Sequence, residues 1–236
     1  MKKNAALPFV FVNVAMTADG KIAPANRHFT QFGGPDDRRH LLELRATADA
    51  VMSGARTVDM DRVKLGPGPA RYRRLRLRHG LAEYNLRVIV SGAGTINPQA
   101  AIFKHRFSPI IILTTCRVAK SRLARLRKLA DEVKICGAKE LDLGEALQWL
   151  RKKWKVRRLL CEGGGELNGA LFKAGLVDEI HLTLCPIVLG GRNAPTLADG
   201  AGVAKLADAA RFRLASMKRC GSDLFLVYRR DGRQGL

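Results

Sequence analysis

Several features that would place the chain in a particular class of protein are missing from its sequence. No apolar run reaches the roughly 18 residues that a membrane-spanning helix needs, so we expect no membrane span. The five cysteines are scattered and odd in number, with no Cys-x-x-Cys pair and no histidine cluster nearby. This spacing disfavours a disulfide framework and a metal site, and it favours reduced thiols in a cytoplasmic protein. A serine nucleophile elbow is also missing, so a hydrolase would lack its residues.

Acidic and aromatic residues are scarce. Against 42 lysines and arginines there are 21 acidic residues, which gives a formal net charge of +21. Such a balance is compatible with nucleic-acid binding, but it favours a solvated basic surface in which a few charges meet an anionic substrate. Aromatic residues make up 6% of the chain, so a stacking platform for single strands is poorly supported. Basic residues cluster at 71–78, which we expect in a loop over 66–78, and at 151–158, at the end of a helix.

Segments of strand and helix character alternate along the chain. A helix is expected to open at Pro35, and others at residues 121–130, 144–154 and 167–174. Strands are expected at residues 10–15, 49–53, 86–90, 110–114, 133–136, 158–161, 179–184, 211–217 and 224–228. This alternation predicts an α/β fold around a mostly parallel sheet, and the two consecutive strands at the end predict an antiparallel C-terminal hairpin. With no repeat and no linker, we expect one domain over residues 1–236.

The glycine run after the strand at 158–161 is the strongest sign of a ligand site. It reads Glu162-Gly163-Gly164-Gly165-Glu166-Leu167 and leads into a helix. Glycines let a ligand approach the backbone closely, and a helix N-terminus offers free N–H groups to a phosphate. Its spacing differs from the dinucleotide fingerprint of the Rossmann fold. A plain strand-to-helix turn would need fewer glycines, so we favour phosphate contact.

Weaker signals lie earlier in the chain. Residues 53–57 form a second turn after a strand, in which Thr57 could cap a helix. Glu162 lies at the carboxyl end of a strand, where α/β sheets place ligand-binding residues, although it could instead tie down the glycine turn. Asp19-Gly20 is more typical of a simple turn. Arg45 stands beside the apolar stripe of its helix, where a phosphate could engage it through paired hydrogen bonds.

Read together, these segments resemble the pyrimidine reductases of riboflavin biosynthesis. The matching residues are 13–23 (NVAMTADGKIA), 37–39, 44–46, 49–51, the Gly54-x-x-Thr57 turn and, most specifically, 160–191 with Pro186 and Leu189-Gly190-Gly191. The resemblance implies the dihydrofolate reductase-like three-layer fold, with helices on both faces of the sheet. It also implies reduction of the ribose of a phosphoribosylamino-pyrimidine by hydride from NADPH. A zinc deaminase half would need a set of His and Cys ligands, so we expect a stand-alone reductase.

The resemblance assigns roles to individual residues. Glu162 and Asp61 would be catalytic, and Asn13, Arg45 and Glu162 would bind the substrate. The cofactor would contact Ala15, Thr57, Asp61, Ser91 and the run Gly163, Gly164, Gly165, Glu166 and Leu167. Ser91 and residues 114–117 are the candidates for the 2′-phosphate of NADPH. Where the family has a second acid and a Pro-Arg-Leu run, residues 62–65 of this chain read RVKL, so a basic residue from 71–78 could replace the missing phosphate ligand.

Two other functions remain open. A pterin reductase with the same fold should present an acid to the protonated ring nitrogens, in the opening strands or the first helix. No acid is well placed there, although Asp36 and Asp37 are nearby. A basic nucleic-acid-binding domain would not need the two glycine turns, so nucleic acid is an unfavoured partner.

The resemblance implies a homodimer, and an uncovered edge strand such as 224–228 would be a liability. Bacterial bifunctional enzymes usually carry lysine at position 13 and archaeal reductases can carry asparagine, so Asn13 slightly favours the diamino-pyrimidinone substrate over the uracil.

Overall fold

A computed structural model of the protein describes residues 7–27, 32–59 and 63–231. The chain divides into two compact units, each made of segments distant in sequence. Residues 1–9 and 45–159 make up the first unit, and residues 10–44 and 160–236 make up the second. The expectation of a single domain over 1–236 stays a prediction.

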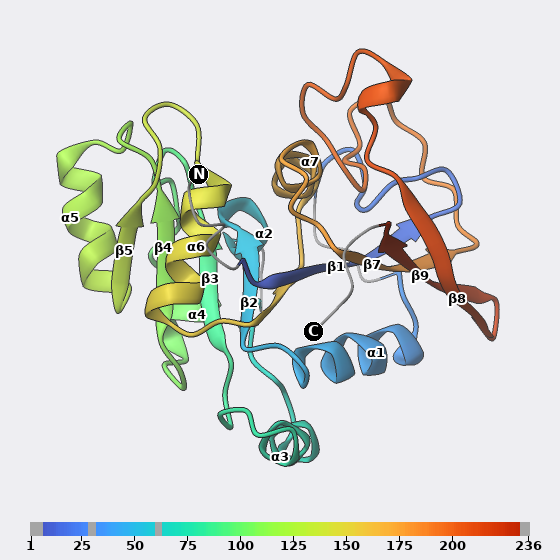
Figure 1. Ribbon diagram of the computed structural model, residues 1–236, viewed down its shortest axis with the longest axis horizontal. Coiled ribbons are helices and arrows are strands. Elements are labelled where there is room, and N and C mark those ends of the chain that lie inside the picture. Colours follow the sequence, from blue (N-terminus) through green and yellow to red (C-terminus); the bar gives the residue numbers. More distant parts are fainter. Residues whose placement is uncertain (1–6, 28–31, 60–62, 232–236) are drawn as a thin grey trace. The chain divides into compact units, whose positions relative to one another are not determined.

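The first unit contains a parallel sheet of strands β2 (Ala50–Gly54), β3 (Leu86–Val90), β4 (Ile110–Thr114) and β5 (Glu132–Ile135). Their order is β5-β4-β3-β2, and Figure 1 draws them in this succession. Every residue of β4 is buried. Its unbroken apolar run is typical of a parallel strand that is covered on both faces.

Five helices belong to the first unit. They are α2 (Ala55–Asp59), α3 (Ala70–Arg78), α4 (Ala101–Lys104), α5 (Lys120–Leu129) and α6 (Leu143–Lys153). The Asp142 side chain caps α6 by accepting a hydrogen bond from Glu145 N at 2.8 Å, as its residue type favours. The basic cluster at 151–158 does begin in the last turn of this helix, as expected.

The segment over 66–78, expected as a loop, contains helix α3. That expectation was wrong because the helix lacks a regular apolar stripe: its buried residues are Tyr72 and Arg76. The Arg76 guanidinium donates to the carbonyl oxygens of Arg45 at 2.7 Å, Ala48 at 2.5 Å and Ala82 at 2.9 Å. The buried Arg76 therefore fixes α3 to the rest of the unit through hydrogen bonds, whereas most amphipathic helices are fixed by buried apolar side chains.

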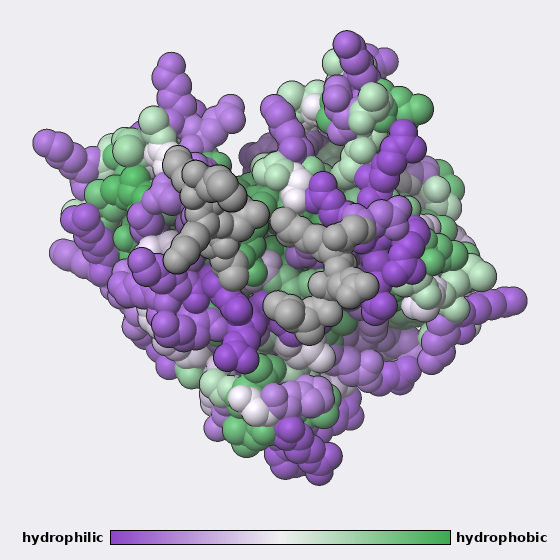
Figure 2. Space-filling view, in the orientation of Figure 1, coloured by the Kyte–Doolittle hydropathy of each residue, from purple (hydrophilic) through white to green (hydrophobic). Residues whose placement is uncertain are grey.

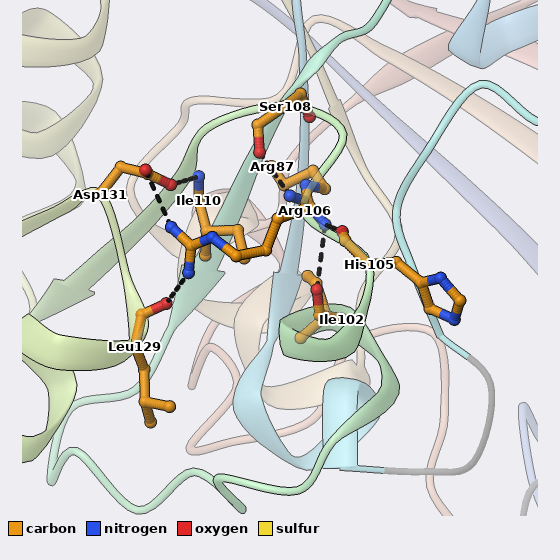
Figure 3. Close-up of polar contacts among 8 residues, drawn as sticks. All are labelled: Arg87, Ile102, His105, Arg106, Ser108, Ile110, Leu129 and Asp131. Carbon is orange, nitrogen blue, oxygen red and sulfur yellow. Dashed lines mark hydrogen bonds and ion pairs between the residues drawn. The ribbon is translucent and has the colours of Figure 1, made fainter.

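A second buried arginine fixes the segment before β4. Arg87 of β3 donates to the carbonyl oxygens of Ile102 at 3.0 Å, of His105 at 2.6 Å and of Ser108 (Figure 3). Burial lowers the pKa of Arg87 to about 10, so it stays charged at neutral pH. Much of the basic charge is exposed, and most side chains visible in Figure 2 are hydrophilic, but these two arginines serve the fold.

The second unit contains β1 (Phe9–Thr17), β7 (Glu179–Cys185), β8 (Phe212–Cys220) and β9 (Asp223–Arg230). Strand β1 pairs with β7 in parallel, and β7, β9 and β8 pair antiparallel in that order. The expected C-terminal hairpin is therefore present, but the outer strand is β8 and not the segment 224–228. Strand β6 (Arg158–Cys161) crosses from the first unit to the second.

Two helices of the second unit flank its strands. Helix α1 (Pro35–Arg45) begins at Pro35, with Asp36 and Asp37 in its first turn, as expected. Helix α7 (Gly165–Lys173) follows the glycine run, and a short 3-10 helix covers Leu206–Asp208. Mostly parallel strands, flanking helices and antiparallel C-terminal strands confirm the predicted fold class. No helix within the described ranges is both long and apolar enough to cross a membrane.

Candidate functional site

In the first unit, the carboxyl ends of β2 and β3 bring two candidate cofactor residues to one edge of the sheet. Gly54 is the register partner of Val90, so the turn after β2 and Ser91 after β3 lie next to each other. Ser91 is buried, and its carbonyl oxygen accepts a hydrogen bond from Gly94 N at 3.0 Å. Thr57 is half-buried within α2, which begins at Ala55, so it does not cap that helix as expected.

Arg45 is the last residue of α1 and is half-buried. Its Nη1 donates to the carbonyl oxygen of Gly66 at 2.7 Å, and Arg76 holds the Arg45 carbonyl. The Arg45 side chain is thus placed against the segment before α3. Asp61, expected as a catalytic and cofactor residue, lies outside the described residues.

The basic cluster at 71–78 offers few arginines to a phosphate. Arg76 is committed to backbone carbonyls, and Arg73 forms an ion pair with Glu83 at 3.1 Å. Arg71 donates to the Tyr72 hydroxyl at 2.9 Å. The exposed Arg74 and Arg78 remain the candidates in this helix for the missing phosphate ligand.

In the second unit, each glycine of the run after β6 has its own surroundings. Gly163 has a φ of +77°, which favours glycine. A Cβ on Gly165 would lie 2.5 Å from the carbonyl oxygen of Thr196 and 2.4 Å from the Asp199 carboxylate, so packing alone requires glycine there. Gly164 has a φ of −73° and a ψ of −168°, and its peptide bond to Gly163 is cis.

The glycine run ends at the first turn of α7. Gly164 is the N-cap residue, and no side chain caps the helix there. Glu162 is half-buried, Glu166 is exposed and Leu167 is buried in the helix. The N-cap residue therefore supplies no side-chain acceptor to the first N–H groups of α7.

A layer of polar side chains lies on one face of the second unit's sheet. Asn13 of β1 is the register partner of His181 of β7, and Ala15 is that of Thr183. His181 and Thr183 are 8% and 1% exposed. Asn13 Oδ1 and His181 Nδ1 are buried and have no hydrogen-bond partner. Such orphan atoms are rare in folded proteins.

Helix α1 adds two titratable groups to this layer. The His40 ring lies 5.3 Å from that of His181, and burial lowers the pKa of His40 to about 4, helped by His181 and Lys218. Asp37 Oδ1 is buried and has no hydrogen-bond partner. Burial raises the pKa of Asp37, and Thr183 and Asp223 act on it in opposite directions.

Glu179 holds the His181 ring in place and pairs with Arg229. Burial by itself raises the pKa of Glu179, but hydrogen bonds from His181 at 2.7 Å and Arg229 at 2.6 Å outweigh it and lower the pKa to about 2. The carboxylate is therefore charged and accepts from His181 Nε2–H.

Asp19 has a structural role, as its turn sequence indicated. It accepts hydrogen bonds from the Thr17 hydroxyl at 2.6 Å and from the backbone N–H groups of Leu189 and Gly190 at 3.1 Å and 2.7 Å. The Thr17 bond comes first among the causes that lower the pKa of Asp19 to about 2. The carboxylate joins the turn after β1 to the segment after β7.

Comparison with known proteins adds the family. Residues 8–226 match the family model described as the RibD C-terminal domain. The chain belongs to the RibD C-terminal domain family. It is 35% identical over 228 residues to the 2,5-diamino-6-ribosylamino-4(3H)-pyrimidinone 5′-phosphate reductase of Methanothermobacter thermautotrophicus, covering 94% of this chain and 97% of that one. It is 34% identical to the reductase of the same name from Archaeoglobus fulgidus, covering 94% and 98%.

A solved structure supports the fold of this RibD C-terminal domain. A pyrimidine reductase-like protein from Corynebacterium diphtheriae matches the structure with a TM-score of 0.76 at 20% sequence identity. The match covers 94% of this chain and 92% of that one. At this identity the structural match shows the fold alone. The similarity in sequence to the named reductases identifies the chain as an oxidoreductase of riboflavin biosynthesis.

The residues of this RibD C-terminal domain fit a nicotinamide cofactor. Gly164 bears no side chain, and as the N-cap residue of α7 it provides no side-chain cap. Both features suit the close approach of a pyrophosphate to backbone N–H groups. A metal has no comparable support, because the described residues contain no group of His, Cys, Asp or Glu that could hold one.

Sequence reasoning did not find most of the polar layer. Asp37 was considered only for a pterin reductase, and His40, His181 and Thr183 were given no role. His181 and Thr183 stand two residues apart in a strand, which places them on one face, but their surroundings depend on α1. Since helix and strand are far apart in the chain, no local signal could have joined them.

Proposed function

We propose that the protein reduces the ribose of a phosphoribosylamino-pyrimidine to its ribityl form, with hydride from NADPH, in riboflavin biosynthesis. The main support is the 35% identity to a named reductase over nearly the full length of both chains. NADPH supplies the hydride, and the chain binds and orients the reactants. The free thiols of all five cysteines suit a cytoplasmic location.

The glycine run and the turn after β2 would hold the cofactor. In the second unit, Gly164 and the start of α7 would meet the pyrophosphate, with Ala15 and residues 163–167 along the cofactor. In the first unit, Thr57, Ser91 and Asp61 would do the same. Glu162 and Asp61 keep their expected catalytic roles as proposals, and Arg45 would meet the substrate phosphate.

The polar layer would bind the pyrimidine. Asn13 Oδ1 and Asp37 Oδ1 are unpartnered oxygen atoms that can accept hydrogen bonds. A surface of acceptors favours a ligand that presents donors. The diamino-pyrimidinone carries an amino group where the uracil carries a carbonyl, so this layer favours the diamino substrate, as Asn13 did in the sequence.

The test is NADPH oxidation with both pathway intermediates prepared enzymatically. We expect turnover of both compounds or of the diamino compound alone, with a higher kcat/KM for the diamino compound. The kcat/KM values are compared because their ratio measures specificity. Turnover of neither compound would refute the proposed function. A clear preference for the uracil would refute the pyrimidine-binding role of the polar layer and leave the reductase function standing.

The basic surface is not assigned a nucleic-acid partner. Arg76 and Arg87 are buried in internal hydrogen bonds, and Arg106 pairs with Asp131 at 2.9 Å. Part of the excess charge thus supports the fold. A pterin is also disfavoured as substrate, because the curated relatives are phosphoribosyl-pyrimidine reductases by name.

A further inference from the structure

A small cavity opens in the first unit, beyond the carboxyl end of β3. Its volume is about 270 Å³, and it is lined by Asp59 of α2, by residues 94–97, and by Arg122, Arg125 and Leu126 of α5. Pockets for complete small molecules usually have volumes of roughly 300–1,000 Å³. The cavity is therefore suited to one end of a larger ligand.

Two arginines give one wall of the cavity its charge. Arg122 Nη1 donates to the carbonyl oxygen of Ala93 at 2.9 Å, which holds its guanidinium against the turn that begins at Ser91. Arg125 lies three residues further along α5, on the same side of the helix. Within the described chain Arg125 has no ion-pair partner. Arginine binds phosphate oxygens through paired hydrogen bonds.

An acid and a turn also line the cavity. Asp59 Oδ1 accepts a hydrogen bond from Asn97 N at 2.8 Å, which fixes the turn over the end of α2. Burial raises the pKa of Asp59, yet its second oxygen can still accept from a hydroxyl. A ligand that carries both a phosphate and a sugar hydroxyl offers a partner to the arginines and to the carboxylate.

We propose that this cavity binds the 2′-phosphorylated ribose of NADPH, with Arg122 and Arg125 on the 2′-phosphate and Asp59 on the neighbouring hydroxyl. The inference rests on the proposed function and adds the residues that distinguish NADPH from NADH. It extends the sequence-based assignment, which named Ser91 and residues 114–117, to α5. The Ala93 contact of Arg122 connects the new residues to the Ser91 turn.

The experiment measures binding by calorimetry, without turnover. The ligands are NADPH, NADH, adenosine 2′,5′-bisphosphate and 5′-AMP, and the variants are Arg125→Gln and the double variant Arg122→Gln/Arg125→Gln. Arg127→Gln on the same helix is the matched control, because Arg127 is exposed and does not line the cavity. Arg125→Gln removes no internal hydrogen bond, so it tests the charge without disturbing the Ser91 turn.

We expect the Kd of NADPH and of the bisphosphate to rise about tenfold in Arg125→Gln and further in the double variant, as for loss of a charged hydrogen bond. The Kd of NADH and of 5′-AMP should stay unchanged, and the control should behave as the parent protein. Equal weakening of phosphorylated and unphosphorylated ligands, or no change in any of them, would overturn the inference. If the parent protein binds neither dinucleotide, the proposed function itself fails; if it binds NADPH and the variants do too, only the cavity assignment fails.

Discussion

Replacing Asp37 with asparagine should separate stability from substrate binding. The carboxyl group is buried at the start of α1, Oδ1 has no hydrogen-bond partner, and burial raises its pKa. A raised pKa means that folding disfavours the charged form. At neutral pH the charge therefore costs stability, and this cost disappears as the pH falls below the ordinary value of 3.8.

The size of both effects follows from these contacts. A neutral amide removes the buried charge but still leaves a polar group, so we expect the free energy of unfolding at pH 7 to rise by about 1 kcal/mol. A hydrogen bond to a charged group contributes about 1.5–3 kcal/mol. Loss of the bond from the substrate's amino group should therefore lower kcat/KM for the diamino compound roughly 10- to 100-fold, with a smaller effect on the uracil.

The assay combines urea unfolding with kcat/KM for both intermediates. Asp36→Asn is the matched control: Asp36 stands in the same turn, but it is partly exposed and pairs with Arg39 at 2.6 Å. It should leave both quantities nearly unchanged. If Asp37→Asn destabilises the protein and keeps full activity on the diamino compound, then Asp37 is a structural residue and the reasoning is wrong.

Four further outcomes are expected. Gly164→Val should keep the fold, which urea unfolding checks, but a side chain at the pyrophosphate should abolish NADPH binding in a fluorescence titration; normal binding would make the turn merely structural. Arg76→Met, which removes three hydrogen bonds to backbone carbonyls, should lower the free energy of unfolding by about 3–5 kcal/mol in urea titrations; a loss below about 1 kcal/mol would contradict this. The pKa of His40 is lowered to about 4 from an ordinary 6.5. The contribution of His40 to the free energy of unfolding is therefore fully present above pH 6.5 and falls by roughly 3 kcal/mol as the pH drops towards 4. His40→Gln should flatten this part of the pH–stability curve, and an unchanged slope would contradict the role of His40. Light scattering at micromolar concentration should give a homodimer, because Leu214 and Met217 on the outer strand β8 are 52% and 64% exposed; a monomer would rule this out.

Local sequence determined much of the architecture. The bounds of β3, β4 and β6 agree with the expected ranges, because each is a short run dominated by apolar residues between turn residues. The start of α1 at Pro35 and the cap of α6 at Asp142 likewise depend on one or two neighbouring side chains. The glycine run before α7 was recognised for the same reason.

Tertiary structure decided what depends on distant partners. Helix α3 has no apolar stripe, so its formation depends on Arg76 reaching the carbonyls of Arg45 and Ala48. The outer position of β8 depends on which strand pairs with β7. The polar layer needs Asn13, Asp37 and His181 together, from a strand, a helix and a second strand separated by up to 168 residues. Side-chain type is written in the sequence, but whether a polar atom is buried and left without a partner depends on the packing of the whole unit.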